Sequence, residues 1–274
     1  MRPVPAVLGP VLALALAACG GSPATSGTRS AGPSTTHSIT LTVYAAASLG
    51  SAMTRIASAY RAAHPGISLT VSTDSSAALE TKIEQGAPAD LFLSADTTNP
   101  QRLIDAGLAA GRQVTPFAGN LLTVIVPADN PARVGSPADL AKSGVKIVAA
   151  GDAVPITKYA TRLVAHLASL PGYPADFAAR YAANVVSRED SVAAVVAKVA
   201  LGEGDAAIVY GTDARASAEV RSIPVPTEAN VPATYGGVVL LDSADTAAAS
   251  AFLGWLAGPD GQAILASFGF LPPS

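Results

Sequence analysis

Apolar positions recur along most of the chain with either the period of a strand or the period of a helix. Each change from one period to the other predicts a junction between a strand and a helix. Residues 39–44 alternate with a period of two, which predicts a half-buried strand, and residues 48–64 follow with helical spacing as far as Pro65-Gly66. The same order recurs to the end of the chain. Further strands are predicted at 67–72, 91–94, 121–126, 145–150, 206–210 and 238–241, and further helices at 77–85, 99–106, 137–141, 157–169, 176–183, 187–201, 245–257 and 259–267.

Short apolar strands that alternate with helices predict an α/β fold, built from mostly parallel sheets with helices on both faces. Ligands of such sheets bind beyond the carboxyl ends of the strands. The segments that follow three predicted strands are Ala45–Leu49 with its Ser48, Ser75-Ser76, and Val154–Thr157. Each segment opens a helix, where hydroxyls and unpaired backbone N–H groups favour an anion. The pattern therefore indicates a receptor for a small oxyanion.

Composition and charge narrow the class of partner. The chain has 274 residues, of which half are hydrophobic and 14% are charged, so it can bury a large core. Lys plus Arg is 17 and Asp plus Glu is 20, and the absence of a basic run argues against nucleic-acid binding. A net charge of −3 does not exclude an anion site, because backbone amides and hydroxyls act at short range.

The N-terminal segment has the pattern of a bacterial lipoprotein signal. Residues 6–18 are apolar, follow Arg2 and end at Cys19, the one cysteine of the chain. This predicts a signal peptide at 1–18, lipidation of Cys19 and, because residues up to 37 are almost all Gly, Ser, Thr, Pro and Ala, a flexible linker over 19–38. A transmembrane anchor is the alternative, but the apolar run falls short of the roughly 20 residues needed. The expected location is the extracytoplasmic face of the cell membrane.

Five further motifs stand in a fixed order along the chain. They are Tyr44-Ala45-Ala46-Ala47-Ser48-Leu49, Gly86-Ala87-Pro88-Ala89-Asp90-Leu91-Phe92, Gly151-Asp152 with Val154-Pro155, Ile208-Val209-Tyr210-Gly211-Thr212-Asp213-Ala214, and Gly258-Pro259 with Phe268-Gly269-Phe270. In this order they resemble the molybdate-binding proteins of bacterial ABC importers. The resemblance implies a two-lobed periplasmic-binding-protein fold of type II with two crossovers. Lobe 1 would comprise 39–120 and 228–274, lobe 2 would comprise 121–227, and the hinges would lie near Gly119-Asn120 and Thr227.

The resemblance also implies which residues hold the oxyanion. By motif position, Ser48 and Ser76 would give hydroxyls and amides from lobe 1. Ile156 and Ser191 would give backbone amides, and Tyr210 its hydroxyl, from lobe 2. No side chain would coordinate the metal atom directly, and neither a catalytic residue nor a cofactor is expected. Each position also has a structural explanation, because serines at helix starts are commonly N-caps and a buried tyrosine needs a hydrogen-bond partner.

The chain departs from the family pattern near the expected site. Ile156-Thr157-Lys158 stands where small residues are common, which leaves the pocket volume open, and Ser191 replaces what is commonly an apolar residue. Lys158 would bring a positive charge near the cleft. Asp74 would repel an anion unless its carboxylate points away.

The predicted function is that of a monomeric solute-binding lipoprotein that captures molybdate, and also tungstate, and delivers it to an ABC permease with its ATPase subunits. A receptor for sulfate or another small oxyanion is the alternative, and so is a sensor subunit. A membrane-anchored serine hydrolase built on Ser48 is a remote alternative. It lacks a G-x-S-x-G segment, and the three histidines, His37, His64 and His166, show no catalytic or metal-binding spacing.

Overall fold

The computed structural model of the chain describes residues 38–273, which belong to the unit spanning His37–Ser274. The predicted signal peptide at 1–18, Cys19 and the linker as far as residue 37 lie outside the described residues. Within the described part of the chain, none of the helices is long and apolar enough to cross a membrane.

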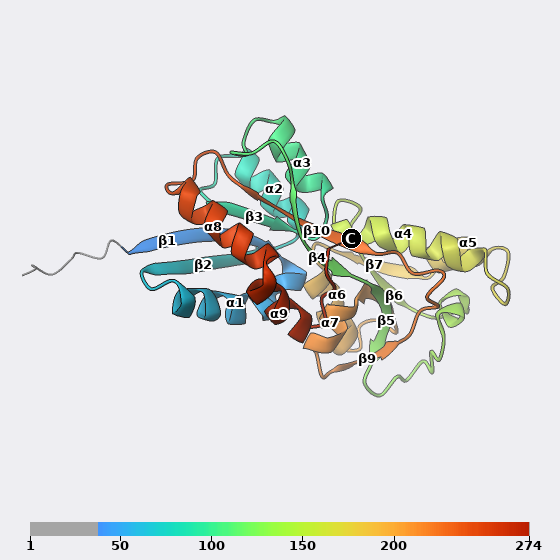
Figure 1. The fold of residues 1–274 in the computed structure, drawn as a ribbon. Helices are drawn as coiled ribbons and strands as arrows, with labels where there is room; N and C mark the ends of the chain where they lie inside the picture. The colour runs from blue at the N-terminus through green and yellow to red at the C-terminus, as the bar shows by residue number, and fades with distance from the viewer. Residues whose placement is uncertain (1–37, 274) are drawn as a thin grey trace, which may run out of the picture. The chain divides into compact units, whose positions relative to one another are not determined.

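A five-stranded sheet, here called sheet A, forms one side of this unit (Figure 1). Its strands are, in spatial order, β2 (Ile67–Asp74), β1 (Ile39–Ala46), β3 (Leu91–Ser94), β10 (Ala233–Val239) and β4 (Thr115–Asn120). β1 is parallel to β2 and β3, whereas β10 is antiparallel to β3 and β4. The helices of this part are α1 (Gly50–Ala63), α2 (Ser76–Glu84), α3 (Thr98–Asp105), α8 (Thr246–Ala257) and α9 (Pro259–Ser267).

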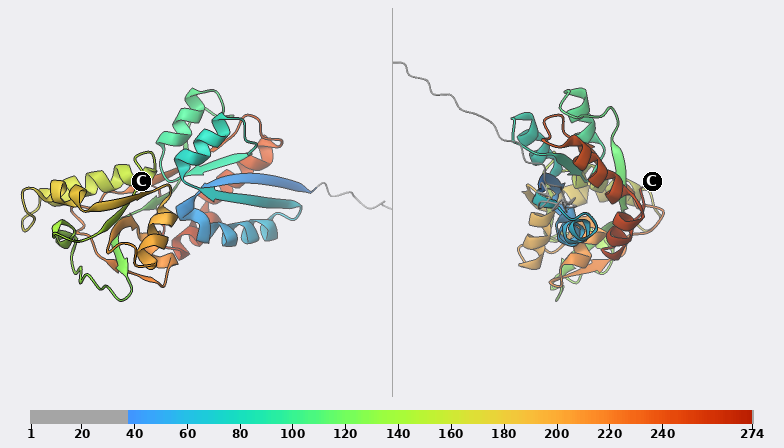
Figure 2. Two further views of the ribbon diagram at one scale, coloured as in Figure 1. Left: turned by 180° about the vertical axis from the view of Figure 1, so that it is seen from behind. Right: turned by 60° about the vertical axis from the view of Figure 1, so that its left-hand side comes forward.

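Alternation along the strands of sheet A places apolar side chains on both of its faces. Phe92 of β3 packs with Leu79 of α2 and Leu103 of α3 on one face. Its neighbours on the strand, Leu91 and Leu93, belong to the larger core that contains residues of α1, α8 and α9. The views in Figure 2 agree with these contacts, because α2 and α3 lie together on one side of sheet A and α1, α8 and α9 lie on its other side.

Two smaller sheets are formed by the middle of the chain. β5 (Leu122–Pro127) lies between β8 (Ala207–Tyr210) and β9 (Val220–Ile223), both antiparallel to it, and β6 (Ile147–Ala150) is parallel to β7 (Val185–Glu189). The surrounding helices are η2 (Pro137–Ala141), α4 (Pro155–Ala168), α5 (Phe177–Ala183), α6 (Val192–Ala200) and α7 (Gly211–Ala216). Strands within 39–120 and 228–274 form sheet A, and strands within 121–227 form the two smaller sheets. These are the sequence ranges predicted for the two lobes, but that they act as lobes stays a prediction.

The predicted α/β class is confirmed, with two corrections. Sheet A is mixed, the β8–β5–β9 sheet is antiparallel and only the β6–β7 pair is wholly parallel, so the sheets are not mostly parallel. The helix predicted over 187–201 is also wrong at its start. Residues 187–189 belong to β7, and α6 begins only at Val192, where the Ser191 hydroxyl accepts a hydrogen bond from the Ala194 N–H at 3.2 Å.

Side-chain and main-chain hydrogen bonds tie the segments where the chain passes between sheet A and the smaller sheets. The Asn230 carboxamide bonds to both backbone groups of Leu122: its oxygen accepts from the N–H at 3.0 Å and its nitrogen donates to the carbonyl at 2.8 Å. Near the C-terminus, Leu271 exchanges two backbone hydrogen bonds with Gly119. A Cβ atom on Gly119 would lie 2.6 Å from the carbonyl oxygen of Pro272, so only glycine allows this approach.

Candidate functional site

A small cavity of about 10 Å³ lies where strand ends of sheet A meet helix starts from the middle of the chain. This volume is far below the roughly 300–1,000 Å³ of pockets that hold drug-sized ligands, so the cavity in this form excludes ligands of that size. Its lining comes from the β1–α1 junction, the start of α2, the end of β3, the starts of α4 and α6, and the end of β8. The residues are Ala46, Ala47, Ser48, Ser75, Ser76, Ala95, Val154, Pro155, Ile156, Val192 and Tyr210.

Helix N-termini give the cavity its electrostatic character. The starts of α2, α4 and α6 and of the short helix η1 (Ala47–Leu49) that leads into α1 all contribute lining residues. First-turn amides have no acceptor within their own helix, and each helix carries roughly +0.5 charge at this end. No lining side chain is charged. An anion that needs only hydrogen-bond donors therefore finds several of them and meets no carboxylate on the cavity wall.

Tyr210 supplies an unused donor. Its side chain is 1% exposed, it lines the cavity, and its hydroxyl has no hydrogen-bond partner within the part of the chain that the structure describes. Burial raises the pKa of Tyr210 well above its usual value, so the hydroxyl keeps its proton at neutral pH. A buried donor without a partner costs about 1–3 kcal/mol. A ligand oxygen in the cavity would remove this penalty.

The serines are already held by the protein through their oxygen atoms. The Ser76 oxygen accepts from the Ala95 N–H at 3.0 Å, and the Ser75 oxygen caps α2 by accepting from the Ala78 N–H at 3.3 Å. Ser48 lies 2.8 Å from the Tyr235 hydroxyl. A hydroxyl whose oxygen accepts a bond still has its own proton to donate. For Ser76, that proton is free for a guest in the cavity.

The structure brings together four of the five residues that sequence predicts as ligand contacts. Ser48, Ser76, Ile156 and Tyr210 line the cavity. Ser191 does not line it. Its hydroxyl caps α6, and the following residue, Val192, reaches the cavity instead. It stays a prediction that the four residues lining the cavity, and Ser191, contact an ion. The sequence interpretation missed Val192 because it started the helix too early.

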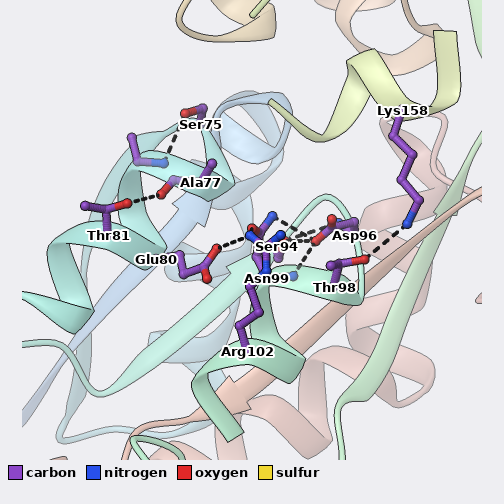
Figure 3. Close-up of polar contacts among 11 residues, drawn as sticks. Ser75, Ala77, Glu80, Thr81, Ser94, Asp96, Thr98, Asn99, Arg102 and Lys158 are labelled. Atoms are coloured by element: carbon purple, nitrogen blue, oxygen red, sulfur yellow. Dashed lines mark hydrogen bonds and ion pairs between the residues drawn. The ribbon is translucent and has the colours of Figure 1, made fainter. Parts of the chain in front are cut away.

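The positive charge of Lys158 is not part of the cavity wall. Figure 3 shows the side chain reaching from α4 to Thr98, whose hydroxyl lies 3.1 Å from the Lys158 ammonium group. Nearby, the Asp96 carboxylate accepts hydrogen bonds from the Ser94 hydroxyl and from the backbone and side-chain amides of Asn99. Neither Lys158 nor Asp96 lines the cavity.

Hydrolytic and metal-binding arrangements are not found among residues 38–273. Ser48 bonds to a tyrosine, whereas the ring of His64 contacts that of Tyr60 at 4.3 Å and His166 lies 3.1 Å from the Ala229 carbonyl oxygen. No group of three or more His, Cys, Asp or Glu in this range could hold a metal ion. The described site thus offers binding groups without a nucleophile–base pair.

Asp213 is a buried carboxyl three residues after Tyr210 in the sequence, and the Tyr210 backbone hydrogen-bonds to it. One of its oxygens has no partner among the described residues. Burial raises its pKa to about 7, opposed by a hydrogen bond from the Tyr210 backbone. Because the unfolded carboxyl has a pKa near 3.8, the folded state holds this proton more tightly. The resulting stabilisation is complete below about pH 4 and is lost as the pH rises through about 7.

We therefore expect the contribution of Asp213 to the free energy of unfolding to fall between about pH 4 and about pH 7. Asp213→Asn should flatten this part of the profile, since the amide cannot ionise. Urea denaturation of both proteins across this range measures the effect, with the exposed Asp152→Asn as control. An unchanged slope in Asp213→Asn would show that other groups cause the pH dependence.

Comparison with known proteins gives a consistent result. Over residues 41–271 the chain matches the family described as bacterial extracellular solute-binding protein. It is 36% identical over 265 residues to the molybdate-binding protein ModA of Mycobacterium tuberculosis, which covers 96% of this chain and 95% of that protein.

Solved structures extend the comparison. One, described as the substrate-binding domain of a putative molybdenum ABC transporter from Clostridium difficile, is 29% identical with a TM-score of 0.65, and covers 86% of this chain and 100% of its own. The sulfate-binding protein SubI of Mycobacterium tuberculosis superposes with a TM-score of 0.75 at 23% identity, over 85% of this chain and 87% of its own. The latter likeness shows the fold alone.

Proposed function

The chain belongs to the bacterial extracellular solute-binding proteins, and from this premise we propose that it captures molybdate for an ABC importer. The observation that carries the proposal is the buried, unpartnered Tyr210 hydroxyl, which lies among the described residues in the wall of a small cavity without charged side chains. A tetrahedral dianion that carries no proton accepts hydrogen bonds and offers none. Tungstate has the same charge and shape and is proposed as a second ligand.

Binding joins donors from both parts of the fold. Ser48 and Ser76 belong to the segments around sheet A, and Ile156 and Tyr210 belong to the middle of the chain. We propose that residues 39–120 with 228–274 and residues 121–227 act as two lobes. Closure brings both donor sets to the ion and excludes water, which strengthens each bond. The ion thereby stabilises the closed form, because only that form makes all the contacts.

The step after capture requires a partner in the membrane. We propose that an ABC permease with its ATPase subunits accepts the ion from the closed protein, and that no covalent chemistry takes place on the receptor itself. Lipid attachment through Cys19, a location on the extracytoplasmic face of the membrane, and a monomeric state complete the proposal. The family assignment and the lipoprotein pattern around Cys19 support the location.

Sulfate is the second candidate ligand, because it is also a dianion without a proton at neutral pH and the cavity presents donors only. A thermal-shift panel separates the candidates, since a ligand that binds only the folded state adds about 2.7 kcal/mol at 100 times its dissociation constant. We expect molybdate and tungstate to raise the unfolding temperature most. Phosphate and a neutral sugar serve as controls and should have little effect. A larger shift with sulfate would make the protein a sulfate receptor, and no shift with any anion would reject the proposal.

A further inference from the structure

A chain of hydrogen bonds, buried beyond its first link, leads from the segment between sheet A and the smaller sheets to Ser48. Its first link is the Leu121 backbone N–H, which lies 3.0 Å from the side-chain oxygen of Asn120. A backbone N–H only donates, so the carboxamide oxygen of Asn120 must face it. The carboxamide nitrogen therefore faces the opposite way, toward the Thr212 hydroxyl at 2.8 Å and the Tyr235 hydroxyl at 3.3 Å.

Tyr235 links the fixed orientation of the Asn120 carboxamide to the Ser48 hydroxyl. Its side chain is fully buried, and its oxygen accepts a bond from Asn120, which is 2% exposed. The tyrosine has one proton left to donate, and the Ser48 oxygen lies 2.8 Å away. Burial raises the pKa of Tyr235 well above its usual value, which keeps this proton in place at neutral pH. Either hydroxyl could donate in this bond, and with Asn120 as donor to Tyr235 the direction that uses the tyrosine's own proton runs from Tyr235 to Ser48.

The Ser48 hydroxyl can then donate its own proton to a ligand in the cavity. Ser48 lines the cavity and Tyr235 does not, so Tyr235 contacts Ser48 from outside the cavity wall. Ser76 reaches the same state by a shorter route, because a backbone N–H, that of Ala95, donates to its oxygen. Both serines thus direct O–H groups at the ligand, and each serine oxygen already has one of its two lone pairs occupied, which disfavours an oxyanion that must donate a proton of its own.

The backbone is shaped to place Tyr235 at this point. The pairing of β10 with β4 shifts register between Tyr235 and Gly236, an irregularity that re-aims the neighbouring side chain. At Gly236, a Cβ atom would lie 2.4 Å from a Val114 methyl group. The close fit holds this part of β10 in one position.

We propose that Tyr235, held by Asn120, is a positioning residue that makes Ser48 a hydrogen-bond donor to the ligand and so selects oxyanions without a proton over protonated ones such as hydrogen phosphate. The inference rests on the proposed function. It assigns to Tyr235 and Asn120 a role in selectivity, although neither touches the ion.

A double-mutant cycle tests whether Tyr235 acts through Ser48. Isothermal titration with molybdate at neutral pH compares the wild type, Tyr235→Phe, Ser48→Ala and the double variant. We expect Tyr235→Phe to lower the affinity roughly tenfold, but less than about twofold when Ser48 is already alanine. The ratio of molybdate to phosphate affinity should also fall in Tyr235→Phe, because a released Ser48 hydroxyl can turn and accept a proton. Tyr60→Phe, which removes another buried hydroxyl, is the matched control and should leave both values unchanged.

The outcomes separate the inference from the function on which it rests. A loss of affinity that is equal whether position 48 carries its native serine or the alanine of the Ser48→Ala variant would mean that Tyr235 acts through the fold, and would overturn the inference alone. Unchanged affinity in Tyr235→Phe would do the same. A wild-type protein that binds no molybdate would overturn the proposed function and the inference together.

Discussion

Replacing Tyr210 with phenylalanine is expected to weaken molybdate binding roughly 10–100-fold and, at the same time, to leave the ligand-free protein as stable as before or more stable. The two effects have opposite signs for one reason. In the ligand-free protein the hydroxyl is buried and has no partner among the described residues, so its removal relieves a penalty. In the complex the same hydroxyl donates to a charged oxygen, a bond worth about 1.5–3 kcal/mol.

Titration calorimetry and urea denaturation of the same variant measure the two effects. Tyr60→Phe is again a suitable control, because the Tyr60 hydroxyl is also buried without a hydrogen-bond partner among the described residues but lies outside the cavity lining. It should keep its affinity for molybdate. A Tyr210→Phe protein that binds as tightly as the wild type, or that loses both affinity and stability, would contradict a ligand-binding role for the hydroxyl.

Asn230→Ala is expected to lower the free energy of unfolding by roughly 2–6 kcal/mol, because it leaves two backbone groups of buried Leu122 without their partners at about 1–3 kcal/mol each. Leu122 opens β5 and pairs with Tyr210 in the ladder to β8. The Asn230 carboxamide therefore hydrogen-bonds to the Leu122 backbone as a neighbouring strand would. Loss of the side chain would loosen the chain next to the cavity as well as destabilise the fold.

Urea denaturation gives the size of the effect, and amide hydrogen exchange at Leu122 gives its location. Asn184→Ala is the matched control, since that carboxamide also bonds to two backbone groups, the carbonyls of Leu140 and Lys142, but its loss leaves no N–H unsatisfied. Equal losses of stability in the two variants would show that Asn230 has no special role where the chain passes between the sheets.

Sequence patterns located most of the regular structure because the local signals were strong. The helix expected over 157–169 is α4, which begins at Pro155, where a missing N–H has no consequence. The strand expected over 39–44 is β1 with two more residues. Errors arose where two local signals competed. Ser187 precedes acidic residues in the manner of a helix start, but Ser191 makes the actual N-cap bond and Ser187 belongs to β7.

Other features depend on contacts that no local pattern encodes. The last predicted strand, 238–241, misses most of β10, because Gly236-Gly237 lowers the strand propensity. The glycines are there for packing: a Cβ atom on Gly237 would lie within 3.0 Å of side-chain atoms of Leu93 and Leu253. Tyr235 could not be identified as a partner of Ser48 for a similar reason, since 187 positions separate them.

The candidate site shows the same division. Ser48, Ser76, Ile156 and Tyr210 follow from motif position, and all four line one cavity. Which way the Ser48 and Ser76 hydroxyls point depends on groups elsewhere in the chain, such as the Tyr235 hydroxyl and the Ala95 N–H. Sequence thus indicates the groups that meet an ion, and the three-dimensional network indicates whether each group donates or accepts.

The aromatic packing of α8 has a spectroscopic consequence. Trp255 is the one tryptophan of the chain, and it lies 5.1 Å from the Tyr60 ring and 6.3 Å from that of Phe252, outside the cavity wall. An arriving anion would not touch the indole, so direct quenching of its fluorescence is not expected. Any change in emission during titration would instead record a rearrangement of the surrounding protein, and the chain thereby contains an intrinsic optical reporter that distinguishes motion from mere occupancy.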